Sequence, residues 1–364
     1  MPEAELVWAK RADDSWWTTD PLPGFFNEAG DRTLDWNRSV AMDDQYVYMP
    51  RQQGGETVVY YFPINDPSQV KTLDMTGVTT DATHTVSSCQ VVDDGNGGTA
   101  LLVSNLARNG QDFKVYKWTG VASAPEVILN YSTWNAAKTG AARLGDKFSF
   151  NGTLQDGEVV TVNYDVGGRF WIFPVKGGLA DIPEGYFGEN GWTSDFHQGS
   201  NIVGGTRFPG TDAYLLWGAN LLTTITSIWM RGSEGMGFAG SFPDYVGMFD
   251  PQFFTVGRSK YMAYASLTDV QDNKYYSTIR IVRILKNADG ADSPYVTMTD
   301  SPSDGGLVLG IGQASAMVPV MDANTNGNMV AGCCVRQIGG VTYVLGSDTN
   351  NALVLYRLKI PASL

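Results

Sequence analysis

The chain has 364 residues, 43% of them hydrophobic and 17% charged, with a formal net charge of −13. This hydrophobic share is enough for a packed core, so the composition excludes a globally disordered chain. The negative charge opposes binding to a phosphate backbone, and no apolar stretch approaches the roughly 20 residues of a membrane-spanning helix. We therefore expect no nucleic-acid partner and no transmembrane segment.

The first predicted element is a strand at residues 6–11, which has no strand partner nearby in the sequence. In a ring of sheets, such a strand often pairs with the last sheet and so removes two free edges. We expect it beside Val341–Leu345 or Leu353–Leu358. The next segment, Asp13–Asp35, is rich in Trp, Pro, Gly and acidic residues and has no periodicity, which predicts a long loop.

After this loop, six stretches repeat one plan of short alternating strands separated by Gly, Asn or Asp turns. The plan is clearest in Arg38–Pro63, and it recurs at Val86–Trp118, Arg143–Pro174, Gly199–Met230, Phe249–Leu285 and Gly310–Leu358. The spacing of roughly 48 to 62 residues is typical of a four-stranded propeller blade with its loops. We predict an all-β fold, a β-propeller of four-stranded antiparallel blades, with six blades favoured and seven as the alternative. One domain would span residues 1–364, with blades at 36–81, 84–130, 140–186, 195–242, 245–300 and 306–360 and the ring-closing strand at 6–11.

The turns between these strands carry the residues that tight hairpins need. Gln155-Asp156-Gly157 lies between two apolar runs and is the strongest hairpin signal in the chain. Asp43-Asp44 and the segment Asp93–Gly98 fall in similar places. Asn, Asp and Gly accept positive φ, which two-residue hairpin turns require.

The three cysteines, Cys89, Cys333 and Cys334, all lie in apolar strand patterns. A disulfide-stapled secreted domain would carry many more, so we interpret them as small buried side chains. Neighbouring residues on a strand point to opposite faces, which argues against a metal shared by Cys333 and Cys334.

Three phrases of the sequence carry a resemblance to a known family: Trp36–Tyr48, Phe113–Trp118 and Arg143–Phe148. They resemble uncharacterised exported β-propeller proteins, a domain of unknown function, from gut Bacteroidetes. The resemblance spans most of the chain but rests on strand patterns that contain no catalytic signature. It implies a propeller fold and an extracellular or cell-surface protein, often a lipoprotein, in a group whose exported proteins often handle glycans. The sequence shows no export signal and no lipid-anchor cysteine, so this localisation rests on the resemblance.

Acidic residues at the starts of the repeats are the candidates for catalysis. Asp146 follows Arg143 in an Arg-x-Gly-Asp motif, and Asp250 has a similar place in a later repeat, so both would line the central channel. They could form an acid–base pair, hold a ligand or ion, or cap backbone N–H groups. Asp195 and His197 are the other candidates, because His197 with nearby carboxylates would suit general acid–base chemistry.

Aromatic residues in the predicted loops are the main candidates for ligand binding. Trp16, Trp17, Trp134 and Trp192 could stack on the apolar faces of sugars or could fill gaps between blades. Arg38 and Arg143 are further ligand-binding candidates, because both lie at equivalent repeat starts near the predicted channel mouth.

We expect no metal and no cofactor. Only two histidines are present, His84 and His197, and the calcium-like segment Asp322–Gly327 lacks the acid expected at the twelfth position. The leading hypothesis is an exported, monomeric, non-catalytic protein that binds a glycan or a surface protein, with carbohydrate recognised on one propeller face. The alternatives are a glycan-active hydrolase or lyase that uses channel Asp and His residues, and a protein-interaction scaffold.

Overall fold

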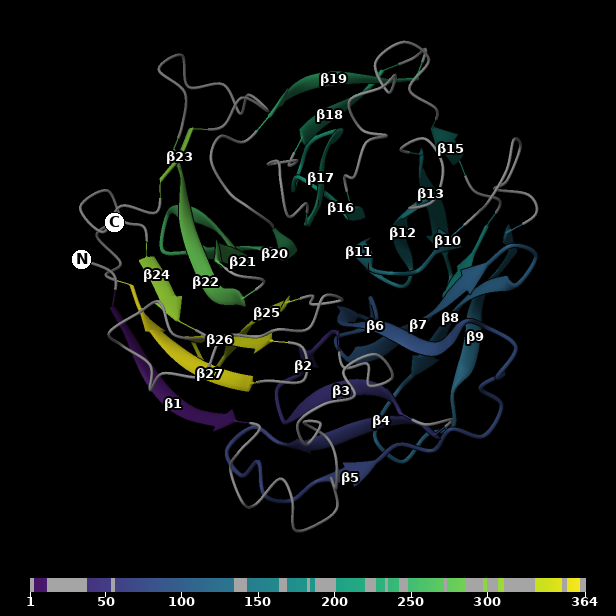
Figure 1. Ribbon diagram of the computed structural model, residues 1–364, viewed down its shortest axis with the longest axis horizontal. Coiled ribbons are helices and arrows are strands. Elements are labelled where there is room, and N and C mark those ends of the chain that lie inside the picture. Colours follow the sequence, from purple (N-terminus) through teal and green to yellow (C-terminus); the bar gives the residue numbers. More distant parts are fainter. Residues whose placement is uncertain are drawn as a thin grey trace.

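The computed structural model describes residues 3–11, 38–53, 56–133, 143–163, 169–181, 184–186, 201–219, 227–232, 235–241, 248–271, 274–285, 297–299, 307–310, 331–348 and 352–360. Within these ranges the strands form six antiparallel sheets, which surround a common centre (Figure 1). The predicted all-β propeller class is confirmed. No helix in the described ranges has the length and apolar character needed to span a membrane.

The first three sheets follow one another along the chain, each with its strands mostly in sequence order. The first contains β2 (Ala41–Met42), β3 (Tyr46–Gln53), β4 (Glu56–Pro63) and β5 (Lys71–Thr72). The second contains β6 (His84–Asp93), β7 (Thr99–Arg108), β8 (Asp112–Trp118), β9 (Glu126–Ser132) and β10 (Arg143–Leu144). The third contains β11 (Phe148–Gly152), β12 (Asp156–Asn163), β13 (Arg169–Lys176), β14 (Leu179–Ala180) and β15 (Glu184–Tyr186).

The other three sheets complete the ring. The fourth contains β16 (Asn201–Arg207), β17 (Ala213–Ala219), β18 (Ser227–Gly232) and β19 (Gly235–Ser241). The fifth contains β20 (Phe249–Val256), β21 (Ser259–Gln271), β22 (Lys274–Leu285), β23 (Thr297–Thr299) and β24 (Leu307–Gly310). The sixth contains β25 (Ala331–Ile338), β26 (Val341–Asp348), β27 (Ala352–Lys359) and the N-terminal β1 (Glu3–Arg11).

The N-terminal strand closes the ring against the C-terminal strand. β1 pairs antiparallel with β27, with Leu6 opposite Tyr356 and Lys10 opposite Leu353. This is one of the two positions predicted for the strand. Trp8 also joins β1 to the first sheet, because its indole N–H donates to the Ile64 carbonyl at 2.7 Å. The two ends of the chain are thereby joined through main-chain pairing and a side-chain contact.

Two short strands, β10 and β24, belong to other sheets than the predicted blade boundaries indicated. Arg143–Leu144 falls in the predicted blade 140–186, but it pairs with β7 of the second sheet. Leu307–Gly310 falls in the predicted blade 306–360, but it pairs with β22 of the fifth sheet. Each segment follows the sheet that it joins and pairs with an inner strand of it, since β7 also pairs with β6 and β8 and β22 also pairs with β21 and β23. An alternating pattern by itself cannot assign such a short strand to one sheet or the next.

The two strongest turn signals form hairpins. β6 and β7 are joined at Asp93–Gly98, where Gly95 and Gly97 have φ of +80° and +91°. β11 and β12 are also joined, but Gly152 lies opposite Gly157 and the turn is centred before Asp156, which already belongs to β12. The predicted hairpin is therefore present, with its turn displaced toward the N-terminus.

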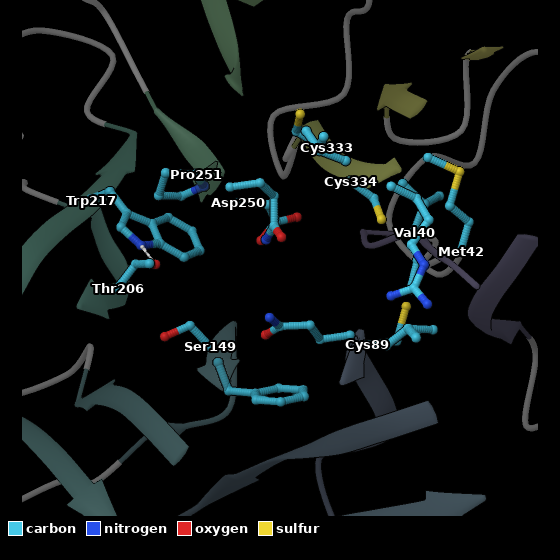
Figure 2. A pocket seen from close by; sticks show the side chains of 17 residues that line it. Val40, Met42, Cys89, Ser149, Thr206, Trp217, Asp250, Pro251, Cys333 and Cys334 are labelled. Atoms are coloured by element: carbon cyan, nitrogen blue, oxygen red, sulfur yellow. Dashed lines mark hydrogen bonds between the residues drawn. The ribbon is translucent and has the colours of Figure 1, made fainter. Parts of the chain in front are cut away.

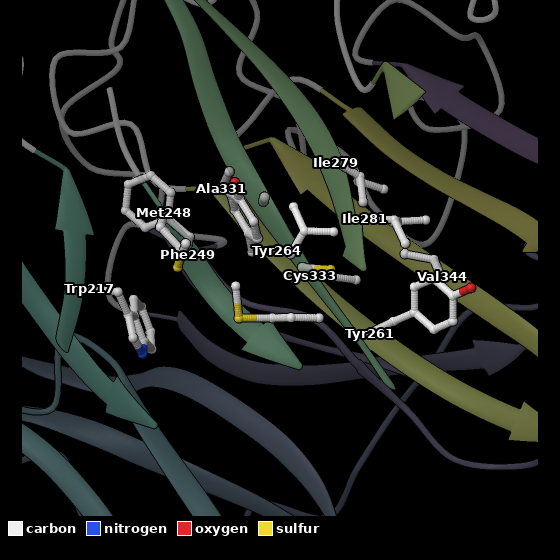
Figure 3. Close-up of a cluster of buried hydrophobic side chains, with 14 of the residues drawn as sticks. Trp217, Met248, Phe249, Tyr261, Tyr264, Ile279, Ile281, Ala331, Cys333 and Val344 are labelled. Carbon is white, nitrogen blue, oxygen red and sulfur yellow. The ribbon is translucent and has the colours of Figure 1, made fainter. Parts of the chain in front are cut away.

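The hydrophobic core lies between neighbouring sheets and not in a single central mass. One cluster joins residues of the fourth, fifth and sixth sheets, and three smaller clusters lie between the second and third, the sixth and first, and the first and second sheets. Figure 3 shows the first cluster, in which Tyr264 lies near Cys333, Tyr261 lies near Val344, and Trp217 lies on the side of Met248 and Phe249; all three rings are fully buried. Large rings fill the wedge-shaped space between sheets that diverge from an axis, which leaves the axis itself to polar side chains.

Candidate functional site

Charged side chains from three sheets meet where the innermost strands begin. Asp146, immediately before β11, is 1% exposed and accepts hydrogen bonds from two guanidinium groups. Arg38, just before β2, donates at 3.0 Å, and Arg143 donates through Nε at 2.6 Å and through Nη2 at 2.5 Å. Burial acts to raise the pKa of Asp146, but the charges of Arg38 and Arg143 outweigh it and hold the pKa below its usual range. Asp146 is therefore an ionised structural carboxylate at neutral pH.

The glycine before Asp146 allows the tight turn that places the Asp146 carboxylate between the two arginines. Gly145 has a φ of +90°, and a Cβ atom placed there would lie 2.0 Å from the carbonyl oxygen of Asn105. Only glycine fits such a left-handed, closely packed turn without strain. The turn redirects the chain between β10 and β11 and so brings Asp146 between the two arginines.

The neighbouring residue, Lys147, is a fully buried cation that connects further sheets. Its ammonium donates to Asp250 Oδ2 and to the Arg38 carbonyl at 2.5 Å each, and to the Ala331 carbonyl at 3.4 Å. Burial lowers the pKa of Lys147 and raises that of Asp250, and the attraction between the two charges opposes both shifts. Lys147 thus links the first, third, fifth and sixth sheets at the axis.

Asp250 has an unusual backbone conformation. Its φ is +48°, and the register of β20 against β21 shifts between Phe249 and Gln252, which marks a β-bulge. A left-handed non-glycine residue stores strain, and such residues concentrate at ligand-binding and catalytic positions. The bulge directs the Asp250 carboxylate toward the axis.

Two of the four candidate catalytic residues can therefore be placed. Asp146 and Asp250 both lie near the axis, as predicted, but each is engaged by buried cations. Arg38 and Arg143, predicted to bind ligand, both hydrogen-bond to Asp146, and ligand binding by them stays a prediction. The other predicted residues, Trp16, Trp17, Trp134, Trp192, Asp195 and His197, lie outside the described residues, as does the segment Asp322–Gly327.

A small cavity lies on the axis beside Asp250. Its volume is about 30 Å³, and its lining residues include Val40 and Ser149, near the starts of β2 and β11, and Thr206, near the end of β16. Figure 2 shows Asp250 and Ser149 on opposite sides of this space, with Cys89, Cys333 and Cys334 toward one end. All three cysteines are buried and unoxidised, and burial raises the pKa of each thiol. The predicted burial of the cysteines is confirmed.

A larger groove lies beside this cavity, between the third and fourth sheets. Its volume is about 610 Å³, within the range of small-molecule sites. The groove and the cavity are neighbours, because five residues line both: Gln90, Ser149, Thr206, Pro251 and Gln252. The groove widens outward between the β11–β12 and β16–β17 hairpins.

Glu158 is the central polar residue of the groove. Its carboxylate is almost buried and accepts the Tyr214 hydroxyl at 2.9 and 3.0 Å and the Asn151 amide at 3.3 Å. Arg207 lies 3.7 Å from the same carboxylate. These contacts fix the orientation of the carboxylate. Sequence reasoning missed Glu158, although one signal was present: its side chain lies on the same strand face as the buried Val160 and Val162.

The formal charges around the groove and the cavity are largely paired on the protein itself. The ion pairs are Lys176–Asp156 at 2.5 Å, Arg207–Asp212 at 2.5 Å and Arg336–Asp44 at 2.7 Å. The groups left to contact a ligand are mainly amides, hydroxyls and the faces of Phe and Pro, including Phe208, Pro209 and Phe253. Such a surface suits a neutral polar ligand better than a strongly charged one.

Within the described residues, no group of three or more His, Cys, Asp or Glu side chains is arranged to hold a metal ion. His84, one of the two histidines, lies half-buried near the Arg38–Asp146 pair. Burial, and then the positive charge of Arg38, lower the pKa of His84 to about 4. His84 is therefore neutral at physiological pH.

Comparison with solved structures identifies the fold. The structure is similar to that of a DUF4623 family protein from Bacteroides eggerthii, with a TM-score of 0.65 and 16% sequence identity over 98% of this chain and 76% of that chain. The chain is thus structurally similar to an uncharacterised family of Bacteroides propellers. At this identity the similarity establishes the fold, and it agrees with the fold that the sequence resemblance implied.

Other solved structures are similar at lower scores. Trypanosoma rangeli sialidase has a TM-score of 0.46 and 10% identity, over 89% of this chain and 54% of that chain. A mutant of AofleA from Arthrobotrys oligospora has a TM-score of 0.46 and 11% identity, over 91% of this chain and 86% of that chain. No protein-family model and no curated protein matches the chain.

Proposed function

We propose that the chain is a six-bladed, non-catalytic propeller that binds carbohydrate in the groove between its third and fourth sheets. The observation that supports this most directly is the groove itself, with a volume of about 610 Å³ and an oriented Glu158 carboxylate at its centre. Each of the six described sheets would be one blade.

The chemistry of the groove suits a sugar. Hydroxyl-rich rings need hydrogen-bond acceptors and donors in fixed positions, which Glu158, Asn151 and Gln252 would provide. Sugar rings also present apolar C–H faces, which pack well on flat rings. Phe208 and Phe253 supply these rings, with centroids 5.0 Å apart.

The alternatives have less support among the described residues. A hydrolase would need a proton donor, and Asp146 is held ionised by two arginines. Asp250 is the one carboxylate with a specific feature in favour of catalysis, its strained backbone, but Lys147 occupies its Oδ2. A scaffold would need a broad apolar patch, whereas the large apolar side chains exposed in the described part of the chain lie on strands of three different sheets: Val7, Val127 and Leu179.

We also propose an extracellular or cell-surface location. A lipid anchor is one way in which the protein would be held there. This follows from the resemblance to exported gut Bacteroidetes propellers, and a carbohydrate ligand would fit that environment. Fractionation of the native host, with antibody access to intact cells as the readout, would contradict the proposal if the protein stayed inside the cell.

Binding of the purified protein to a glycan array tests the proposed function. We expect specific binding that falls about tenfold or more in Asn151→Ala and Arg207→Met, because each loses a groove hydrogen-bonding group. Lys117→Met is the matched control, since Lys117 pairs with an exposed Glu126 in the second sheet. Trp192→Ala tests the predicted loop site in parallel: loss there, with binding kept in the groove variants, would move the site to the loops. Binding to no glycan would overturn the proposal.

A further inference from the structure

The inner end of the groove differs from the rest of it in size and polarity. The groove can hold whole sugar rings, but the axial cavity at its end measures about 30 Å³. A cavity needs roughly 10–15 Å³ of this volume for each water molecule, so two non-hydrogen atoms fit. The occupant of the cavity must therefore be a small substituent of a ligand whose main body stays in the groove.

The lining of the cavity favours a hydroxyl group. Asp250 borders it with a carboxylate, of which Oδ2 is held by Lys147, and a carboxylate has about four acceptor positions in all. Thr206 is fixed by the indole N–H of Trp217 at 3.0 Å, and Ser149 donates to the Gly205 carbonyl. Acceptor positions thus face the cavity from side chains that are already oriented.

Backbone features keep this end of the groove in shape. The bulge and the φ of +48° at Asp250 place its carboxylate beside Gly332, where a Cβ atom would lie 3.4 Å from Asp250 Oδ2 and 3.4 Å from Val40 Cγ2. The same Cβ atom would lie only 2.5 Å from Ser347 Oγ, so a side chain at position 332 would clash with Ser347 while touching Asp250 and Val40. Backbone strain, as at Asp250, is expected at residues whose exact position matters for ligand binding.

We infer that the axial cavity reads the exocyclic hydroxymethyl group of a hexopyranose, with Asp250 as the acceptor of its hydroxyl hydrogen bond. A CH₂OH group has two non-hydrogen atoms and one donor, which match the size and the polarity of the cavity. A pentopyranose lacks this group and would leave the cavity to water. The inference rests on the proposed function and adds the substrate class: hexose in preference to pentose.

Matched sugars that differ only in this group test the inference. The probes are the methyl glycosides of glucose, galactose and mannose, each compared with its pentose counterpart from xylose, arabinose and lyxose, with affinity measured by NMR titration at millimolar concentrations. We expect at least one hexoside to bind about tenfold or more tightly than its pentoside, because one methylene-sized group in a pocket is worth roughly 10–200-fold.

A cavity-filling substitution supplies the decisive variant. Val40→Ile adds one methylene beside the cavity without changing any charge, and Val103→Ile is the control at a buried position of another cluster. Val40→Ile should reduce hexoside affinity to that of the pentoside and leave pentoside affinity unchanged. Equal binding of each pair by the wild-type protein overturns the inference and leaves the proposed function intact. Binding of none of the six sugars, with an empty glycan array, overturns both.

Discussion

The buried cations at the axis are the residues whose replacement should cost most. Lys147 is 0% exposed and holds Asp250, so Lys147→Met would leave a buried carboxylate without its partner. We expect the free energy of unfolding to fall by about 3–5 kcal/mol, the usual cost of breaking a buried pair. Chemical denaturation checks this value.

Lys176→Met is the matched control for Lys147→Met. Its ion pair with Asp156 has the same 2.5 Å distance, but both side chains are at least 70% exposed. Exposed pairs contribute little to stability, so the control should unfold nearly like the wild type. Equal losses in the two variants would show that the Lys147 network does not stabilise the ring.

His84 makes the stability of the protein depend on pH. Its pKa is about 4 in the folded chain, below the usual 6.5, so at intermediate pH the unfolded chain binds the proton more readily. The stability that His84 contributes is complete above pH 6.5 and is lost as the pH falls toward 4. Denaturation at several pH values measures the free energy of unfolding. Between pH 6.5 and 4 it should fall by about 2 kcal/mol less in His84→Gln than in the wild type, once solvent screening is allowed for. The same pH profile in both proteins would contradict this.

At the residue scale, the sequence identifies which residues reach the axis but not what they do there. The repeat starts correctly indicate that Asp146 and Asp250 lie near the centre. Their partners come from other sheets: Arg38 is 108 residues from Asp146, and Lys147 is 103 residues from Asp250. A local pattern carries no information about such distant pairs, so a salt-bridged carboxylate and a free one look alike in the sequence.

The groove shows the same limit. Glu158 is visible in the sequence as an acid on a buried strand face, but its partner Tyr214 lies on β17 of the next sheet. The groove exists only because two hairpins from consecutive repeats lie side by side. Its residues could be identified only after the sheets were placed around the axis.

At the element scale, Trp8 should determine how firmly β1 closes the ring. Its indole donates to Ile64 and its ring packs edge-on against Phe62, so it joins β1 to the first sheet as well as to β27. Trp8→Ala should lower the free energy of unfolding by about 2–4 kcal/mol, toward the lower end for large-to-small changes because the residue is only partly buried. Val7→Ala, at the neighbouring exposed position, is the control and should have little effect. If Trp8→Ala were as stable as the control, the contact of Trp8 with the first sheet would not stabilise the closed ring.

Strand order was more predictable than strand membership. Turn residues with positive φ locate the β6–β7 hairpin correctly, because Gly95 and Gly97 are needed there whatever surrounds them. The sheet that a short strand such as β10 or β24 joins depends on which inner strand lies beside it in the folded ring. That choice is made by the folded ring and is absent from the local pattern.

For the molecule as a whole, the seam between β1 and β27 is where, among the described strands, the two ends of the chain pair to close the ring. Glu5 and Arg357 face each other across it at an exposed position. A disulfide from Glu5→Cys with Arg357→Cys would therefore close nearly the whole chain into one loop. Cross-links of long loops typically stabilise by about 2–4 kcal/mol because they restrict the unfolded chain.

The seam disulfide should raise the Tm of the oxidised protein above that of its reduced form, measured by calorimetry with and without a thiol reductant. The native cysteines do not confuse the comparison, because all three are buried with raised thiol pKa values. A Tm that rises on oxidation would mean that unfolding includes opening of the seam. An unchanged Tm in a protein whose disulfide has formed would contradict the prediction, because the cross-link would then give no net stabilisation through the unfolded chain.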